Sequence, residues 1–191
     1  MITIEGYHGT DLECAKKILT EGFRYKHSDK HWLGNGNYFY LDHSLAEWWT
    51  TNPSRKFGVN IKVPSIIKVK IEVEKDKCVD LRKLEDFKDF SDIYFKDFIP
   101  LLKGTGIPIR GDNRLNIRTK YCDYLKKAYN KEVIIGSFLL MNQPYLKDRK
   151  DYYLKLNKHF NLIYEELQMC VFNNENIVSK EVIEKARWNN V

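Results

Sequence analysis

Residues 2–23 read ITIEGYHGTDLECAKKILTEGF, and they set out a strand, a turn and a helix. The alternation at the start of this stretch is typical of a short strand that runs into Gly9. Thr10 stands three residues before Glu13, and this spacing predicts that Thr10 caps the helix. We expect the helix to end before Gly22, because glycine accepts the backbone angles that follow a last helical turn.

Further strands and helices are predicted along the rest of the chain, without a regular strand–helix–strand period. The clearest strand covers residues 66–74, where apolar and charged side chains alternate. The other expected strands are 38–41, 133–141 and 167–172, and the expected helices are 44–50, 81–102, 116–130 and a last one that begins at Ser179. This mixture favours the α+β class over a doubly wound α/β sheet.

The length of 191 residues suits one domain, and we expect a single domain over 1–191 with a largely helical basic insertion at about 82–160. No apolar run approaches the roughly 18 residues that a membrane span needs, so we expect no membrane partner. The four cysteines are spaced too widely for a zinc knuckle or a small disulfide framework. Free thiols in a cytoplasmic protein are therefore expected.

The positive charge is concentrated in one part of the chain. The net charge is +6, and residues 101–160 alone carry thirteen lysines and arginines against five acidic residues. A concentrated basic region suits an anionic partner such as RNA or DNA, and it equally suits a lysine-rich surface that only faces water. Arg110, Arg114 and Arg118 recur every four residues, so a helix would place them in one stripe that could bind an anionic acceptor.

The residues with the clearest chemical signal lie beside glycines in two stretches, YHGT (7–10) and GNGNYF (34–39). Glycine lets a ligand approach the backbone closely. The imidazole of His8 can bond a sugar hydroxyl, and the ring of Tyr38 can stack on a flat heterocycle. The sequence has no phosphate-binding Walker loop, no G-x-S-x-G elbow and no H-E-x-x-H helix, and we expect no metal.

The order and spacing of these motifs resemble the NAD-binding half of the poly(ADP-ribose) polymerase-like ADP-ribosyltransferases. The resemblance covers residues 7–49: the HGT segment at 8–10, a helix followed by Gly22-Phe23, and LGNGNYF at 33–39. It extends loosely to 66–81. The resemblance implies a split antiparallel β-core of the ADP-ribosyltransferase type, with helical insertions, that clamps NAD as a substrate.

The resemblance also implies a role for each matching residue. His8 would bond the 2′-hydroxyl of the adenosine ribose, and the backbone of Gly9 would hold the carboxamide of nicotinamide. Tyr38 would stack on the nicotinamide ring. Three further residues would make secondary contacts with NAD: Thr10, Asn35 and Gly36.

The third residue of the family's catalytic triad, a glutamate on a late strand, is replaced in this chain. Gln168 stands in its place, and Glu166 lies two residues earlier on the same face of the expected strand. Either Gln168 orients the ribose while Glu166 supplies the carboxylate, or catalysis relies on an altered triad. The alternative is that Glu166 is an exposed strand residue and Gln168 a hydrogen-bonded one. The loss of the glutamate favours a single transfer over chain elongation.

These expectations describe an NAD-dependent mono-ADP-ribosyltransferase that modifies a macromolecular acceptor, with nucleic acid favoured over protein. By analogy, the setting would be a toxin or a defence protein against phage, with an inhibitory protein as a partner. Two alternatives stay open: an NAD glycohydrolase, which transfers to water, and a non-catalytic module that binds NAD or ADP-ribose. An RNA 2′-phosphotransferase ranks lower, because no paired arginines lie near His8.

Overall fold

One seven-stranded sheet organises the computed structural model, which describes residues 1–51, 61–106, 114–138 and 165–183. The strand order is β4-β5-β6-β2-β1-β3-β7, and all neighbours are antiparallel except β4 and β5. The strands are β1 (Ile2–Asp11), β2 (Asn37–Tyr40), β3 (Pro64–Val73), β4 (Cys78–Asp80), β5 (Val133–Phe138), β6 (Glu166–Val171) and β7 (Ile177–Ile183). The mixed, mostly antiparallel class predicted from the sequence is confirmed.

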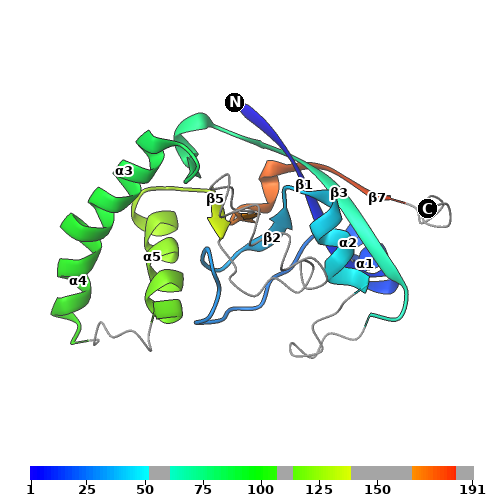
Figure 1. Cartoon of the computed structure of the whole chain (residues 1–191), viewed down its shortest axis with the longest axis horizontal. Helices are drawn as coiled ribbons and strands as arrows, with labels where there is room; N and C mark the ends of the chain where they lie inside the picture. Colours follow the sequence, from blue (N-terminus) through cyan, green and yellow to red (C-terminus); the bar gives the residue numbers. More distant parts are fainter. Residues whose placement is uncertain (52–60, 107–113, 139–164, 184–191) are drawn as a thin grey trace, which may run out of the picture.

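Within the described ranges, five α-helices lie at the two ends of this sheet. They are α1 (Leu12–Glu21), α2 (His43–Thr51), α3 (Leu84–Ile93), α4 (Ile99–Gly104) and α5 (Arg114–Ala128). A π-helical segment, η3 (Tyr94–Phe98), joins α3 to α4, and two short 3-10 segments are η2 (Lys75–Lys77) and η6 (Asn174–Asn176). Figure 1 shows α1 and α2 beside β1 and β3, whereas α3, α4 and α5 gather beside β5.

The apolar side chains form two clusters. Phe39, Ile71 and Met169 belong to a cluster built on strands from across the sheet and on α1. Tyr121 and Leu125 of α5 belong to the second cluster, which fills the space between the sheet and the helices of Figure 1's left side. Neighbouring residues of one strand contribute to different clusters because successive side chains of a strand point to opposite faces.

The sheet is nearly divided between β1 and β2. Strand β1 pairs with β3 over ten register positions, but it pairs with β2 only at Tyr7 and Tyr40. Strand β2 pairs along its whole length with β6. On one side of this pair, residues 8–11 of β1 and residues 37–39 of β2 are not register partners. We call this junction the β1–β2 seam.

The start of α1 differs from the sequence prediction. Asp11, not Thr10, is the N-cap, and its carboxylate accepts a hydrogen bond of 3.1 Å from the amide of Glu13. The prediction was wrong because β1 continues through Thr10, which is a register partner of Ser65. Asp11 also accepts a bond of 2.9 Å from the amide of Val63, so this one side chain joins the end of β1 to the start of β3.

The helix predicted from Ser179 is wrong as far as residue 183; residues 184–191 lie outside the described part of the chain. Residues 177–183 form β7, which pairs antiparallel with β3. The edge of β3 offers unpaired backbone groups, and the β-branched residues of this segment suit a strand. The predicted insertion at 82–160 holds α3, α4 and α5, but it also holds β5, a strand inside the sheet.

Gly9 lets α2 lie close to β1. A Cβ at this position would lie 2.4 Å from the carbonyl oxygen of Ala46 and 2.7 Å from Cγ2 of Thr50. Both distances are well below van der Waals contact, and the carbonyl belongs to the helix backbone, which cannot turn aside alone. The close packing of α2 on β1 therefore requires glycine here.

We expect Gly9→Ala to lower the free energy of unfolding by about 1–3 kcal/mol, because the added methyl group overpacks this contact. Gly104→Ala is the control, since a Cβ at Gly104 would meet no atom within 4 Å. The control should be neutral or stabilising by up to about 1 kcal/mol. Urea unfolding measures both values. Equal values in the two variants would contradict the packing of α2 described above.

Candidate functional site

His8 bridges the β1–β2 seam. Its Nδ1 atom donates a hydrogen bond of 2.9 Å to the carbonyl oxygen of Tyr38. The ring meets Phe23 and Phe39 edge-on, with centroid distances of 5.4 and 6.0 Å. Because a carbonyl only accepts, Nδ1 carries the proton, and Nε2 of the neutral ring is a hydrogen-bond acceptor. The side chain thus joins two strands where their backbones do not pair.

Burial determines the charge of this imidazole. It lowers the pKa of His8 below its ordinary value, while the bond to the carbonyl of Tyr38 opposes the change in part. An unperturbed histidine titrates near about 6.5, so His8 is neutral at pH 7. A neutral His8 presents Nε2 as an acceptor for a hydroxyl group, such as one on a sugar.

The hydroxyl of Tyr38 is held by the turn that precedes β2. It donates a hydrogen bond of 2.9 Å to the carbonyl of Gly34 and accepts one of 2.6 Å from the amide of Leu33. Burial raises the pKa of Tyr38, so the hydroxyl stays neutral. The ring meets His31 edge-on at 5.7 Å. These contacts fix the orientation of the ring.

His8 and the ring of Tyr38 lie on opposite faces of β2. His8 contacts the backbone of Tyr38 and the ring of Phe39, and consecutive side chains of a strand point to opposite faces. The prediction that the two side chains line one cleft is wrong: His8 contacts the carbonyl oxygen of Tyr38, while the ring of Tyr38 packs against the second cluster on the other face of the sheet. A ligand that contacts both side chains has to cross the seam.

Asn35 and Gly36 fasten the turn before β2 to the rest of the molecule. The backbone amide and Nδ2 of Asn35 donate bonds of 2.8 and 2.6 Å to the carboxylate of Asp123 on α5. Its Oδ1 accepts a bond of 2.8 Å from the amide of Ser28. A Cβ on Gly36 would lie 2.6 Å from the carbonyl oxygen of Val171. Both residues have structural roles, and their contacts with NAD stay predictions.

Glu166 and Gln168 contact each other on one face of β6. The Nε2 atom of Gln168 donates a hydrogen bond to Oε1 of Glu166. Glu166 is only 5% exposed, so the alternative that treats it as an exposed strand residue is wrong. Gln168 lies opposite Tyr40 of β2. Burial and the charge of Glu166 both raise the pKa of Tyr40.

Tyr40 extends this polar face across the sheet, and the sequence analysis did not single it out. It lies opposite Tyr7 of β1, whose ring meets His43 of α2 edge-on at 5.4 Å. Directly opposite residues share a face of a sheet. The signal that could have found Tyr40 is its position two residues after Tyr38, which puts both on the same face of one strand.

The three arginines predicted to bind an acceptor are described only in part. Arg110 and the side chain of Arg114 lie outside the described residues. Arg118 is half-buried on α5, and its guanidinium carbon lies 4.7 Å from the ring centroid of Trp32. Phe138 is the second ring near this guanidinium, at 5.9 Å. Arg118 is thus packed against aromatic side chains beside β5.

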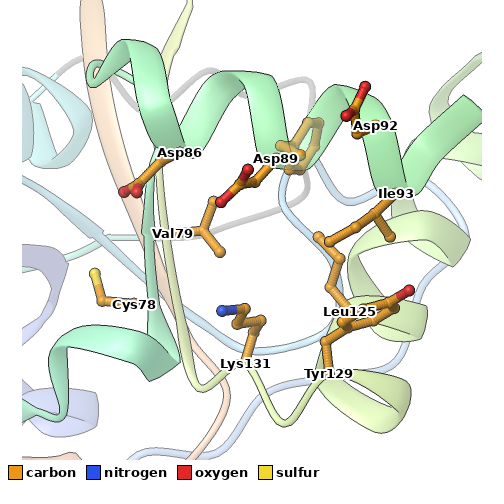
Figure 2. A pocket seen from close by; sticks show the side chains of 10 residues that line it. Cys78, Val79, Asp86, Asp89, Asp92, Ile93, Leu125, Tyr129 and Lys131 are labelled. Atoms are coloured by element: carbon orange, nitrogen blue, oxygen red, sulfur yellow. The ribbon is translucent and has the colours of Figure 1, made fainter.

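A cavity of about 200 Å³ lies away from the seam, where α3 and α5 meet β4 (Figure 2). Asp86 and Asp89 reach toward it from α3, and Lys131 faces them across it. The sequence analysis did not single out these residues. The remaining lining residues are Cys78, Val79, Phe90, Asp92, Ile93, Leu125 and Tyr129.

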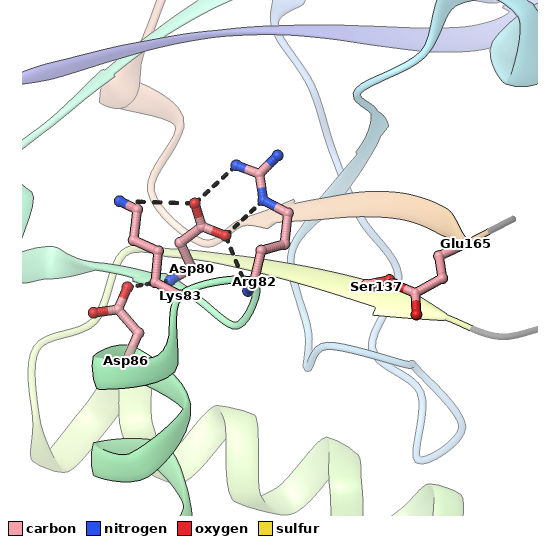
Figure 3. A network of polar contacts seen from close by, with 6 residues as sticks. All are labelled: Asp80, Arg82, Lys83, Asp86, Ser137 and Glu165. Atoms are coloured by element: carbon pink, nitrogen blue, oxygen red, sulfur yellow. Dashed lines mark hydrogen bonds and ion pairs between the residues drawn. The ribbon is translucent and has the colours of Figure 1, made fainter. Parts of the chain in front are cut away.

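A network of ion pairs joins the end of β4 to α3 (Figure 3). Arg82 binds the carboxylate of Asp80 through two nitrogens, with distances of 2.7 and 2.8 Å. Asp86 accepts a bond of 2.7 Å from the amide of Asp80. Burial opposes the charge of Asp80, but the bonds from Arg82 hold its pKa below the ordinary value. The network has a structural role, because the charged groups of Asp80, Arg82 and Asp86 are bonded to one another or to the backbone.

The comparisons with known proteins add one relative. No family model matches the chain. The chain is 29% identical over 192 residues to a protein of Methanocaldococcus jannaschii described as "Uncharacterized protein MJ0359", and the match covers 95% of this chain and 85% of that protein. In the described ranges, helices fall short of the length and apolar character needed to cross a bilayer, and His, Cys, Asp and Glu form no group of three suited to a metal.

We expect Tyr38→Phe to lower the free energy of unfolding by about 1–2 kcal/mol, because two hydrogen bonds to the turn are lost and a backbone amide is left unpaired. Tyr25→Phe is the control, since that hydroxyl only accepts a long bond of 3.4 Å from Lys126. Its effect should stay below about 0.5 kcal/mol. Urea unfolding compares the two, and a neutral Tyr38→Phe would contradict the anchoring of this turn.

We expect stability to fall between about pH 7.5 and pH 5.5 more steeply for the native chain than for His8→Gln. The pKa of His8 is lowered in the folded state. In the unfolded chain His8 therefore takes up a proton at about pH 6.5, whereas in the folded chain it does not. This proton uptake stabilises the unfolded state as the pH falls. Parallel curves of unfolding free energy against pH would show that His8 is not desolvated.

Proposed function

We propose that the chain is an NAD-dependent mono-ADP-ribosyltransferase whose split β-core binds NAD across the β1–β2 seam. The observation that carries the proposal is the single register pair between β1 and β2, with His8 bonded across the opening beyond it. The resemblance of residues 7–49 implies a core that is split in this way and that clamps NAD. The strand order, with β3 and β7 on one side and β6, β5 and β4 on the other, supports the same proposal.

The state of His8 suits the role that the resemblance implies. The neutral ring has its proton on Nδ1, which is bonded to the strand, so Nε2 would accept a hydrogen bond from the adenosine ribose hydroxyl. Gly9 lies next to His8 within β1, opposite Ile66 of β3. The ring of Tyr38, held by Leu33 and Gly34, would form a fixed plate for nicotinamide.

The proposed reaction breaks the bond between nicotinamide and ribose C1. The bonding electrons leave with nicotinamide, which becomes neutral, and C1 becomes electron-poor. The lone pair of the acceptor then forms the new bond to C1, and the acceptor loses its proton to solvent. The buried carboxylate of Glu166 would stabilise the developing positive charge on the ribose, and Gln168 would orient it. Positioning supplies the remainder of the acceleration.

The molecule that receives the ADP-ribose group distinguishes a transferase from a glycohydrolase. Transfer to a nucleic acid or protein makes the chain a transferase, and transfer to water makes it a glycohydrolase. Binding of NAD without cleavage would make it a binding module. The burial of Glu166 beside Gln168 favours an enzyme, because a desolvated carboxylate acts strongly on a nearby positive charge.

Free nicotinamide released from NAD by the purified chain tests the proposal. We expect release by the native protein and a loss of at least about 100-fold in Glu166→Gln, which removes the charge and keeps the shape. Glu165→Gln is the matched control, because the carboxylate of Glu165 is exposed and accepts a hydrogen bond from the hydroxyl of Ser137. The control should retain the native rate.

Two other outcomes have defined meanings. Tight binding of NAD with no nicotinamide release would replace the enzyme by a binding module. Release that is unchanged in Glu166→Gln, or lost equally in both glutamine variants, would remove Glu166 from the reaction.

A further inference from the structure

Three side chains from separate parts of the chain pack against one another beside the end of β5. Trp32 precedes the turn before β2, Arg118 lies on α5, and Phe138 ends β5. The rings of Trp32 and Phe138 meet at 4.7 Å with an interplanar angle of 85°. The guanidinium carbon of Arg118 lies 4.7 Å from the centroid of Trp32 and 5.9 Å from that of Phe138. We call these three side chains the Trp32 stack; all three are half-buried.

The register of the sheet connects the Trp32 stack to the proposed reaction site. Phe138 of β5 is the register partner of Glu166 on β6. Residues in this relation share a face of the sheet, with Cβ atoms roughly 5 Å apart. A group held on the stack would therefore lie one side chain away from the carboxylate that acts on ribose C1.

The stack is held in place by bonds to its supports. The hydroxyl of Thr119, next to Arg118 on α5, donates a bond of 2.7 Å to the carbonyl of His31, next to Trp32. Asp123 of the same helix binds Asn35 at the other end of the turn. The positions of Trp32 and Arg118 are thus fixed relative to each other before any ligand binds.

The chemistry of the stack selects a nucleobase. Aromatic rings and the plane of an arginine guanidinium are the surfaces on which unpaired bases stack, and the charge of arginine suits the adjacent phosphate. Bases in a duplex have their faces covered by neighbouring bases, so a single strand is required. The surplus of basic residues over 101–160, the part of the sequence that holds Arg118 and Phe138, suits a polyanion.

We propose that the Trp32 stack is the acceptor platform and that it takes a base of a single-stranded nucleic acid. The place of this platform beside a reacting carboxylate rests on the proposed function, whereas its affinity for a single strand does not. Arg118, predicted from the sequence as one of three acceptor-binding arginines, contacts the ring of Phe138, the register partner of Glu166.

The test measures binding of fluorescein-labelled oligonucleotides by anisotropy, without NAD. The probes are a mixed-sequence single strand as RNA and as DNA, and a DNA duplex of the same sequence. We expect single strands to bind more tightly than the duplex. Trp32→Ala should weaken single-strand binding by about tenfold, the effect of losing one stacked base, and Trp32→Phe should recover most of it. Arg118→Lys, which keeps the charge but not the plane, should lose about fivefold.

The control uses a second contact between a cation and aromatic rings on the same helix. Lys126 of α5 lies 5.7 Å from the ring of Tyr25. Tyr25→Ala removes the aromatic ring that contacts Lys126 and leaves the Trp32 stack intact. This variant should therefore bind single strands as the native protein does. Circular dichroism and urea unfolding establish that each variant is folded; Trp32→Phe and Arg118→Lys keep the test decisive if Trp32→Ala does not fold.

The outcomes separate this proposal from the proposed function. Single-strand binding that depends on Trp32 and Arg118, with no nicotinamide release, would support the platform and reject the transferase. Nicotinamide release with equal affinity for single strand and duplex, or with equal losses in Tyr25→Ala and Trp32→Ala, would overturn the platform and leave the transferase standing. Modification of a protein in place of the oligonucleotides would also overturn it.

Discussion

The hydrogen bond from His8 to the carbonyl of Tyr38 links β1 and β2 where the backbones of the two strands do not pair. After the single pair of Tyr7 and Tyr40, β1 stays with β3 and β2 stays with β6. Backbone groups inside a sheet need partners. The side chain of His8 supplies one such partner across the seam. The neutral state of the imidazole follows from its burial at the seam, which is also the proposed place of NAD.

The glycines of the two motifs have packing roles that accompany any role in binding. Gly9 admits α2 against β1, and Gly36 admits the turn against β6. Asn35, between the glycines of the second motif, is held by Asp123 of α5. Arg118, on the same helix, contacts the ring of Trp32. One helix therefore positions both the turn that fixes Tyr38 and the proposed acceptor platform.

Local patterns predicted the elements, and long-range pairing decided the site. The alternation at 66–74 predicted β3, and Gly22 ends α1 with a positive φ of 84°, as expected. The cap at Thr10 was wrong because pairing with β3 extends β1 past it. The pairing of Tyr40 with Gln168, and the contact of Trp32 with Phe138, depend on strand order and register. No spacing along the chain encodes these cross-strand relations. The period of two along β2 was a signal for Tyr40 that went unused, and Trp32 had no such local signal.

A crystal structure of the Glu166→Gln variant soaked with NAD tests the central claim most directly, because the variant would bind NAD without cleaving it. The account predicts NAD across the β1–β2 seam, with the adenosine ribose hydroxyl within hydrogen-bond distance of Nε2 of His8 and nicotinamide against the ring of Tyr38. NAD bound instead in the cavity between α3 and α5, with the seam empty, would contradict the account.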